Sequence, residues 1–422
     1  MNESRTKRYA ALVLTCGWLL SLLAVGAAGA QELPPSIIAL SGNQIPQLCG
    51  LPVDDITATA FHGGSPTAVH VQIDQRTRGA DGRWQYVVEA GEEPHPARRD
   101  FSADDLLLLA SQQGGERIPS PPGTTEIEVI GPAGDSRWFY LGRGSAPNLP
   151  PLVTYDATAD RVRGQDYALG FSHSGSAMID SLVIGDPERG SNVLDRSKAR
   201  LTIDLALGIG SLSRSEDDVR VRTTGVHSGP LRIIRECEVR GRMLFGIYSP
   251  PVRDTFIFYP HGFVLPTTVR LTPTARMVTR SVTLRISMDL VDTTGALTFQ
   301  SAPDVPAPIA IDGHGGERGG AHPIAWYLLD RGDIGLLGWL EARDDIAREV
   351  TLYYRDDGPH ADPPEGARGE VGDHGFLFHH SGPLPAGDVR LTSHGWILHG
   401  EQLQHPAAEL RAFATRPTVR VH

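Results

Sequence analysis

The sequence predicts an all-β fold: a small N-terminal β-sandwich with one short helix, followed by a larger antiparallel β domain. Three observations support this. Short apolar runs recur along the 422 residues, several of them alternate apolar and polar residues, and 47 glycines and 32 prolines are spread between the runs. A period of two is typical of strands with one buried face, and Gly and Pro mark the turns between strands.

An export signal is expected at residues 1–30. Three basic residues among the first eight precede an apolar run at 10–25, and small residues end the segment at Ala28-Gly29-Ala30. This order is typical of a cleavable signal peptide. The apolar run, about 16 residues, is shorter than the ~20 that a membrane span needs. We therefore expect cleavage after Ala30, a periplasmic or extracellular location, and no membrane span after cleavage.

The chain without that segment is acidic. The whole sequence has 39 basic and 50 acidic residues, and the segment holds three and one of them, which leaves 36 and 49 and a net charge of −13. Nucleic-acid phosphates and anionic lipids repel such a chain, so we expect neither as a partner. Lys198 is the one lysine outside the segment. Export permits a disulfide between Cys49 and Cys237 without requiring one.

Residues 31–147 are expected to form the small β-sandwich. Residues 69–74 alternate strictly, and the alternation resumes at 84–88 after a glycine-containing turn, which predicts a hairpin. A Ser-x-x-Asp pair at 102–105 then precedes an apolar run. Because such a pair is typical of a helix N-terminus, we predict a short helix at 106–110.

The larger β domain is expected at 152–422, after a proline-rich linker at 145–152. Its clearest strand is 282–290, where apolar residues occupy every second position and polar residues fill the gaps. Further strands are expected at 201–207, 231–239, 324–329, 334–340, 350–354 and 418–421, a weaker helix at 407–413, and a long glycine-rich loop at 312–320.

Several strands of this larger region are long. They include the segment 229–236, the strands between 267 and 290, and the aromatic strand that ends Tyr353-Tyr354-Arg355-Asp356-Asp357. In the length and pattern of these strands, residues 152–422 resemble the β-supersandwiches of galactose-mutarotase-like and polysaccharide-lyase-like proteins. The resemblance implies a supersandwich fold, which hosts sugar-active enzymes and binding modules alike. No catalytic motif of these families matches position by position, so no catalytic residue is carried over.

Arg235 is the first candidate site residue. The predicted strand 231–239 places it in the middle of an apolar face, where an unpaired charge is costly. We favour a structural ion pair. The alternative is a guanidinium that grips a ligand carboxylate, for example that of a uronic acid. Tyr259 and His261 have the chemistry of a base beside such an arginine, so all three are candidate ligand-binding residues.

Other groups of polar residues have simpler interpretations. Ser174 lacks the flanking glycines of a nucleophile elbow, and adjacent acids such as Asp356-Asp357 point to opposite faces of a strand. Zinc or copper could bind if C-terminal histidines converged. Without a recognised metal spacing we favour hydrogen-bonded or solvated histidines and expect no metal. Half of the sixteen histidines lie in the last 63 residues: His360, His374, His379, His380, His394, His399, His405 and His422.

These observations favour a non-catalytic exported protein that binds a carbohydrate or another cell-envelope component without a cofactor. The alternative is a polysaccharide-active enzyme of lyase or epimerase type, with its site in the larger domain. Such an enzyme needs a base beside an arginine that neutralises a uronate. Arg235, Tyr259 and His261 lining one open cleft would favour the enzyme, whereas scattered positions would favour the binding protein.

Overall fold

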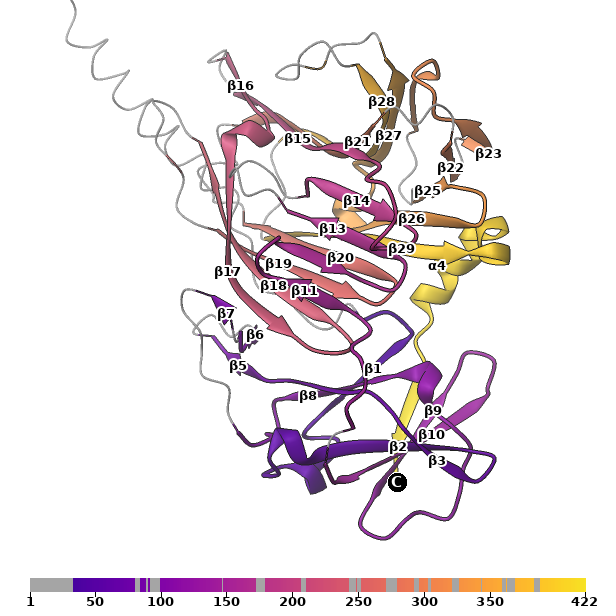
Figure 1. The fold of residues 1–422 in the computed structure, drawn as a ribbon. Coiled ribbons are helices and arrows are strands. Elements are labelled where there is room, and N and C mark those ends of the chain that lie inside the picture. The colour runs from indigo at the N-terminus through magenta and orange to yellow at the C-terminus, as the bar shows by residue number, and fades with distance from the viewer. Residues whose placement is uncertain are drawn as a thin grey trace, which may run out of the picture.

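The computed structural model of the chain is built almost entirely of antiparallel strands (Figure 1), which confirms the all-β class. The expected signal segment 1–30 lies outside the described residues, so its cleavage remains a prediction. The structure describes residues 33–79, 84–88, 90–91, 99–145, 147–171, 179–205, 210–242, 248, 252–270, 279–291, 296–302, 305–320, 326–342, 344–358, 362, 369–382 and 388–422.

Two sheets form the N-terminal sandwich, at the bottom of Figure 1, in the strand orders β1-β8-β4 and β3-β2-β10-β9-β30. Apolar residues such as Leu107 and Phe139 form the core between them. The strands are β1 (Ile37–Ser41), β2 (Ile56–His62), β3 (Ser65–Ala68), β4 (Val71–Asp74), β8 (Leu106–Ala110), β9 (Thr125–Ile130), β10 (Ser136–Arg143) and β30 (Thr418–Val421), with short 3₁₀ helices η2 (Pro46–Leu48), η3 (Val53–Asp55) and η4 (Ser111–Gln113).

Three further sheets form the larger region. The four-stranded sheet consists of β11 (Thr154–Asp156), β12 (Arg161–Arg163), β13 (Tyr167–Gly170) and β14 (Ser181–Ile184). The six-stranded sheet consists, in spatial order, of β16 (Gly210–Arg214), β15 (Leu194–Leu205), β21 (Thr279–Leu290), β28 (Glu370–Ser381), β27 (Val350–Asp357) and β24 (Gly316–Gly320). The ten-stranded sheet consists, in spatial order, of β23 (Val305–Ala310), β22 (Thr298–Ala302), β25 (Trp326–Asp330), β26 (Ile334–Ala342), β29 (Asp388–His399), β20 (Gly262–Arg270), β19 (Val252–Tyr259), β18 (Ile233–Gly241), β17 (Val219–Ser228) and β7 (Ala90–Gly91).

The ten-stranded sheet is apolar on both faces and lies at the centre of the molecule. On one face, residues such as Ile233 and Phe258 join a core shared with the four- and six-stranded sheets. On the other face, residues such as Ile234 and Ile257 pack against Leu108 of the N-terminal sandwich. Because successive side chains of a strand point to opposite faces, neighbouring apolar residues serve both cores.

Most strands expected from alternation are present. Residues 282–290 lie within β21, and the expected strands at 201–207, 324–329, 334–340 and 350–354 overlap β15, β25, β26 and β27. The segment 231–239 corresponds to β18, and 418–421 is β30. The expected C-terminal helix is also confirmed as α4 (Pro406–Ala414), with α3 (Asp344–Ala347), η6 (Glu216–Asp218) and η8 (Gly400–Gln404) as further short helical segments.

The helix predicted at 106–110 is wrong, because these residues form strand β8. All five are buried, and β8 pairs with β1 on one side and β4 on the other. A run of five apolar residues has no period, so a central strand buried on both faces cannot be distinguished from a helix. The Ser-x-x-Asp pair does form a cap: the backbone N–H of Ser102 donates to Asp105 Oδ2 over 2.8 Å, and it caps a turn before the strand.

The hairpin predicted from 69–74 and 84–88 is built differently. Residues 71–74 form β4, which pairs with β8, whereas β6 (Trp84–Tyr86) pairs with β5 (Arg76–Arg78). The glycine-rich segment expected as a loop at 312–320 contributes the edge strand β24, paired with β27. Local alternation identifies strands, but pairing depends on the long-range fit of their faces.

The connection between the two regions packs against both of them. The carbonyl of Pro150 accepts a hydrogen bond from His70 Nε2 over 2.9 Å, and the N–H of Leu152 donates to the Pro230 carbonyl over 2.9 Å. Chain topology also links the regions, because β30 pairs with β9 of the sandwich and β7 pairs with β17 of the ten-stranded sheet. Within the described residues, no helix is both long and apolar enough to cross a membrane.

Candidate functional site

The six-stranded sheet carries charged side chains on the face opposite its core. Its register sets Arg200 of β15 beside Arg285 of β21, and Lys198 two residues away on the same face. Farther across the sheet, on the same face, Arg355 of β27 lies beside Asp373 of β28. The period of two therefore gathers the polar residues of four strands on one face, while their apolar neighbours enter the core.

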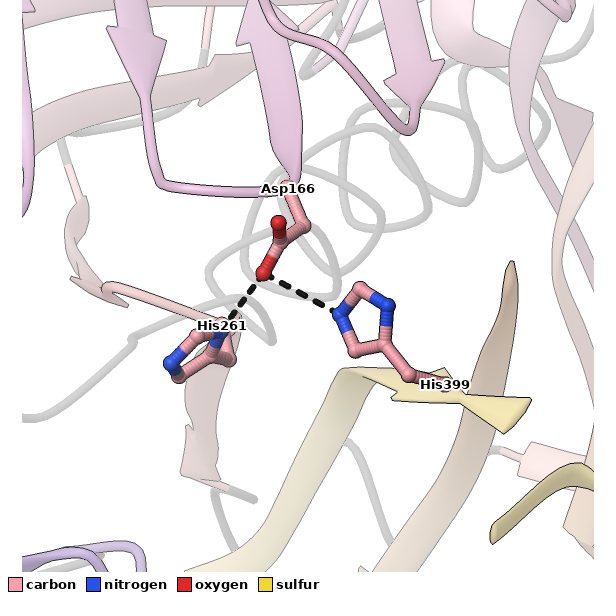
Figure 2. A group of neighbouring side chains, drawn as sticks. All are labelled: Asp166, His261 and His399. Atoms are coloured by element: carbon pink, nitrogen blue, oxygen red, sulfur yellow. Dashed lines mark hydrogen bonds and ion pairs between the residues drawn. The ribbon is translucent and has the colours of Figure 1, made fainter. Parts of the chain in front are cut away.

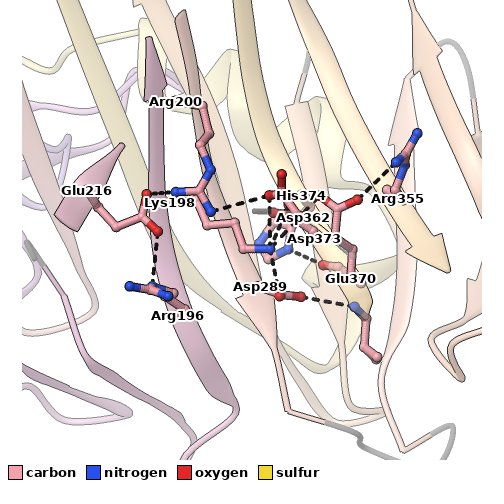
Figure 3. Close-up of polar contacts among 12 residues, drawn as sticks. Arg196, Lys198, Arg200, Glu216, Asp289, Arg355, Asp362, Glu370, Asp373 and His374 are labelled. Carbon is pink, nitrogen blue, oxygen red and sulfur yellow. Dashed lines mark hydrogen bonds and ion pairs between the residues drawn. The ribbon is translucent and has the colours of Figure 1, made fainter. Parts of the chain in front are cut away.

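Lys198 lies at the centre of this face and is fully buried (Figure 3). A buried ammonium is tolerated only when it is paired with anions. Its Nζ is surrounded by four carboxylates, 2.8 Å from Asp289, 3.5 Å from Asp362, 3.6 Å from Asp373 and 3.9 Å from Glu370. Four carboxylates this close to Nζ favour the charged ammonium over the neutral amine. Schiff-base chemistry needs the neutral amine, so Lys198 is unsuited to it.

Arginines connect this centre to the surface. Arg285 Nη1 donates to Tyr353 Oη over 2.7 Å and to Glu370 Oε1 over 3.0 Å, and its Nη2 pairs with Asp362. Arg200 pairs with Glu216 of η6 and lies 3.4 Å from Asp362. We refer to the following residues as the charged cluster: Arg196, Lys198, Arg200, Glu216, Arg285, Asp289, Tyr353, Arg355, Asp362, Glu370 and Asp373.

The charged cluster is electrically balanced when all of its groups are ionised, with five cationic side chains and five carboxylates. Asp373 is the cluster residue whose carboxyl group is not fully ionised at neutral pH. Burial raises the pKa of its carboxyl group to about 7, although Lys198 and Arg285 oppose the shift. Desolvation is the largest single effect on Asp362 and would raise its pKa, but Arg285, Arg200 and Lys198 together outweigh it and hold the pKa below the usual value. The cluster therefore holds one carboxyl group that gains a proton near neutral pH.

A pocket of about 570 Å³ opens beside the charged cluster. Its volume lies in the ~300–1,000 Å³ range of small-molecule sites. Ten of its twelve described lining residues carry a polar or charged group, so the pocket offers donors and acceptors to a ligand rich in hydroxyl groups. The described lining residues are Arg200, Arg214, Arg285, Asp218, Asp362, Thr202, Ser213, Ser215, Thr283, Tyr353, Leu201 and Leu377.

Arg235 has the surroundings that its strand pattern predicts. Its side chain is 3% exposed, and Nη2 and Nε lie 2.6 and 3.0 Å from the two carboxylate oxygens of Asp160. The guanidinium also covers the ring of Phe171 at 4.0 Å. The expected burial and carboxylate partner are confirmed, and a role in ligand binding remains a prediction.

Tyr259 and His261 lie in other surroundings. Tyr259 is fully buried and accepts a hydrogen bond from Arg232 Nη1 over 3.4 Å, beside the N-terminal sandwich. His261 is half-buried and donates through Nδ1 to Asp166 Oδ2 over 2.7 Å. Neither they nor Arg235 line the pocket beside the charged cluster. The three candidate residues pair with three different side chains, Asp160, Arg232 and Asp166.

The C-terminal histidines do not share one site among the described residues. His374 is buried against Tyr327 and contacts the Gly372 carbonyl, and burial lowers its pKa to about 4. His380 pairs with Glu349, whereas His394 stacks on Trp339. His399 alone of this set joins two other potential metal ligands. His360 and Ser174 lie outside the described residues.

The two cysteines lie in different regions. Cys49 Sγ contacts the carbonyl of Gly42 at 3.5 Å in the N-terminal sandwich, and Cys237 Sγ accepts from Arg235 Nη1 over 2.8 Å in β18. No disulfide joins Cys49 to Cys237.

Comparisons with known proteins identify the fold. The chain matches no family model and no curated protein. Among solved structures it is similar to an α-mannosidase from Enterococcus faecalis V583, with 9% sequence identity and a TM-score of 0.51 over 94% of this chain. The chain spans 45% of the length of that mannosidase. At this identity the likeness shows the fold alone.

Two further solved structures belong to the same comparison. One is a protein of glycosyl hydrolase family 38 from Enterococcus faecalis, at 9% identity and TM-score 0.49, covering 94% of this chain and 47% of that one. The other is a candidate aldose 1-epimerase from Escherichia coli K12, at 10% identity and TM-score 0.36, covering 59% of this chain and all of that one. The galactose-mutarotase-like resemblance expected from the sequence is supported as a weak resemblance of fold.

Proposed function

We propose that this chain is an exported, non-catalytic protein that binds a carbohydrate of the cell envelope in the pocket beside the charged cluster. The observation that carries the proposal is the composition of the pocket wall: five hydroxyl-bearing residues, three arginines and two aspartates. Sugars are bound through many hydrogen bonds to such groups. The similarity of fold to an α-mannosidase, an enzyme that acts on a carbohydrate, supports the same ligand class.

The charges at the pocket favour an acidic sugar over a neutral one. Three arginines and two aspartates line its wall, and Arg200 and Arg285 are paired with carboxylates of the charged cluster. Arg214 lies at the exposed side, where it donates to the carbonyl oxygens of Arg242 and Ser213 over 2.9 and 2.7 Å. A guanidinium matches the geometry of a carboxylate, so a uronic-acid residue is the ligand that this wall fits best.

The lyase or epimerase alternative finds less support in the geometry. Tyr353 is the tyrosine beside an arginine at the pocket, as a uronate lyase requires. However, burial raises the pKa of its hydroxyl group well above the ordinary value, and its oxygen is hydrogen-bonded to Glu370. A general base needs the opposite shift, toward the working pH. Binding without chemistry is therefore the better proposal.

Isothermal titration of the chain with oligogalacturonides, and with neutral galactan oligosaccharides of matched length, tests the proposal. We expect the acidic oligosaccharide to bind more tightly, and Arg214→Gln to weaken its binding roughly tenfold, the usual effect of losing one charge-assisted hydrogen bond. Arg222→Gln is the matched control, because Arg222 is 52% exposed and pairs with Glu238 outside the pocket. Failure of the chain to bind either oligosaccharide, or equal binding by the two variants, would contradict the proposal. Formation of an unsaturated sugar product would instead favour the enzyme.

A further inference from the structure

A second site lies on other elements of the larger region, where Asp166, His261 and His399 converge (Figure 2). Asp166 Oδ2 lies 2.7 Å from His261 Nδ1 and 3.1 Å from His399 Nε2. The three ligand atoms are all within 4.8 Å of one another. Three side chains that are distant in sequence therefore direct one carboxylate oxygen and two imidazole nitrogens to the same point.

Backbone hydrogen bonds hold the three segments in this arrangement. Asp166 lies in the turn between β12 and β13, His261 in the turn between β19 and β20, and His399 at the end of β29. The first two turns are joined by the N–H of Gln165, which donates to the Pro260 carbonyl over 2.7 Å. The second turn is joined to β29, because the N–H of Ile397 donates to the His261 carbonyl over 2.8 Å. The site is thus largely organised by the fold itself.

We propose that Asp166, His261 and His399 bind a divalent transition-metal ion of the Zn²⁺ type. Two imidazoles and one carboxylate form the ligand set of many three-ligand zinc sites, which leave a fourth position to water. The side chains are 27% (Asp166), 32% (His261) and 46% (His399) exposed, so an ion can reach them from solvent. This site shares no residue with the pocket, and so the inference is independent of the proposed function.

The observed separations are those of hydrogen bonds, with a proton between carboxylate and imidazole. Ligand atoms about 2.0–2.1 Å from a tetrahedral zinc ion lie about 3.3 Å apart. The two carboxylate–imidazole separations, 2.7 and 3.1 Å, are within a few tenths of an ångström of this value, and the two imidazole nitrogens lie within 4.8 Å of each other, so binding the ion requires only local adjustment of the three side chains. Hydrogen bonding alone is the competing explanation, and it predicts no metal uptake.

Titration of the EDTA-treated chain with Zn²⁺, followed by calorimetry, tests the inference. We expect one tight equivalent, together with an increase in melting temperature, because the ion binds only the folded arrangement. Asp166→Asn and His399→Gln should each weaken this equivalent by at least about 100-fold, since losing even an outer partner of a metal ligand costs about 10–100-fold. Cobalt substitution should give a visible absorption band that both variants lose.

The matched control is His380→Gln. His380 forms the same kind of pair, with Nδ1 2.7 Å from Glu349 Oε2, but no second imidazole joins it among the described residues. This variant should keep the tight equivalent of Zn²⁺. Equal Zn²⁺ binding by the unchanged chain, Asp166→Asn and His380→Gln would overturn the inference, as would the absence of any tight equivalent. Melting temperatures recorded in EDTA separate loss of binding from loss of folding.

Discussion

Asp160 is held in an unusual backbone conformation by the side chains around it. Its φ of +42° lies in the left-handed region that residues with a Cβ rarely adopt, and no other described non-glycine residue has a positive φ. Its carboxylate accepts hydrogen bonds from Arg235 and, over 2.7 Å, from the hydroxyl group of Tyr155. A strained backbone persists when its surroundings over-determine it. The Arg235–Asp160 pair therefore belongs to the framework of the larger region.

Replacing Arg235 tests this role. Arg235→Met keeps the bulk of the side chain and leaves the Asp160 carboxylate, 15% exposed, without its cation. We expect the free energy of unfolding to fall by about 3 kcal/mol, toward the lower end of the range for a broken buried pair. Urea denaturation with Arg222→Met as an exposed control measures the difference. Normal stability with lost binding of an acidic oligosaccharide would instead assign Arg235 to the ligand.

Asp373 predicts a pH dependence of stability. Its folded pKa of about 7 lies above the ordinary 3.8, so between these values the folded chain holds a proton that the unfolded chain releases. The stability that this proton contributes is complete below the lower value and is lost as the pH rises through about 7. Asp373→Asn removes the titration. The melting temperature of this variant, relative to the unchanged chain, should rise between about pH 5 and about pH 8. An identical difference at the two pH values would show that Asp373 is ionised throughout.

At the scale of elements, the sequence predicts strands better than their partners. The alternation at 282–290 identifies β21 because its two faces differ, whereas β8 was misassigned because both of its faces are apolar. The charged cluster follows the same rule. Arg285 stands in a polar gap of the predicted strand 282–290, so its place on a polar face was predictable from sequence, whereas Lys198 precedes the predicted strand 201–207. Their meeting was not predictable, because the register of β15 against β21 spans some 80 residues and is set by the whole sheet.

Candidate ligand residues were harder to find for a related reason. Asp166, His261 and His399 lie in turns and at a strand end, where no periodicity constrains the side chains. Nothing in the local sequence of each turn distinguishes it from the others. The histidine-rich C-terminus drew attention to His399, and the chemistry of a possible base drew attention to His261, but nothing in the sequence pointed to Asp166 or to the meeting of the three.

Replacing two adjacent leucines of strand β8 is expected to have different effects on the structure. Leu107 enters the core of the N-terminal sandwich, while Leu108 packs against the ten-stranded sheet. Each change to alanine should cost about 2–5 kcal/mol, because both side chains are fully buried. Leu108→Ala should in addition loosen the contact between the two regions, seen as faster proteolysis of the connection at 145–152. Thr67→Ala in the exposed strand β3 is the control and should change stability by less than about 0.5 kcal/mol. Equal effects of the three changes would contradict the strand assignment.

At the scale of the molecule, the ten-stranded sheet is covered on one face by the other sheets of the larger region and on the other by the N-terminal sandwich and α4. The C-terminal strand β30, yellow in Figure 1, passes from α4 down to the sandwich and forms the edge of its five-stranded sheet. The order of the sheets therefore does not follow the order of the chain.

Removing residues 415–422 tests the contribution of β30. The deletion removes the partner of β9, so the backbone N–H and C=O groups along that edge become available to strands of other chains. We expect a lower melting temperature and concentration-dependent association, measured by calorimetry and light scattering. Arg420→Gln is the control: it keeps the strand and removes one exposed pair, Arg420–Glu128, worth about 0–1 kcal/mol. A deleted chain that stays monomeric and melts normally would show that β30 adds nothing to the sandwich.

The pairing of β30 also determines the order in which the molecule can fold. Val129 of β9 pairs with Val419, which the ribosome adds about 290 residues later. During that interval four strands of the sheet exist without the fifth, and their apolar face has no complete partner. Pairings of such high contact order form slowly, because a long loop must close before any contact stabilises it. The first region of the chain to be synthesised is thus among the last to be completed, and a factor that shields the open edge of β9 would raise the yield of folded protein.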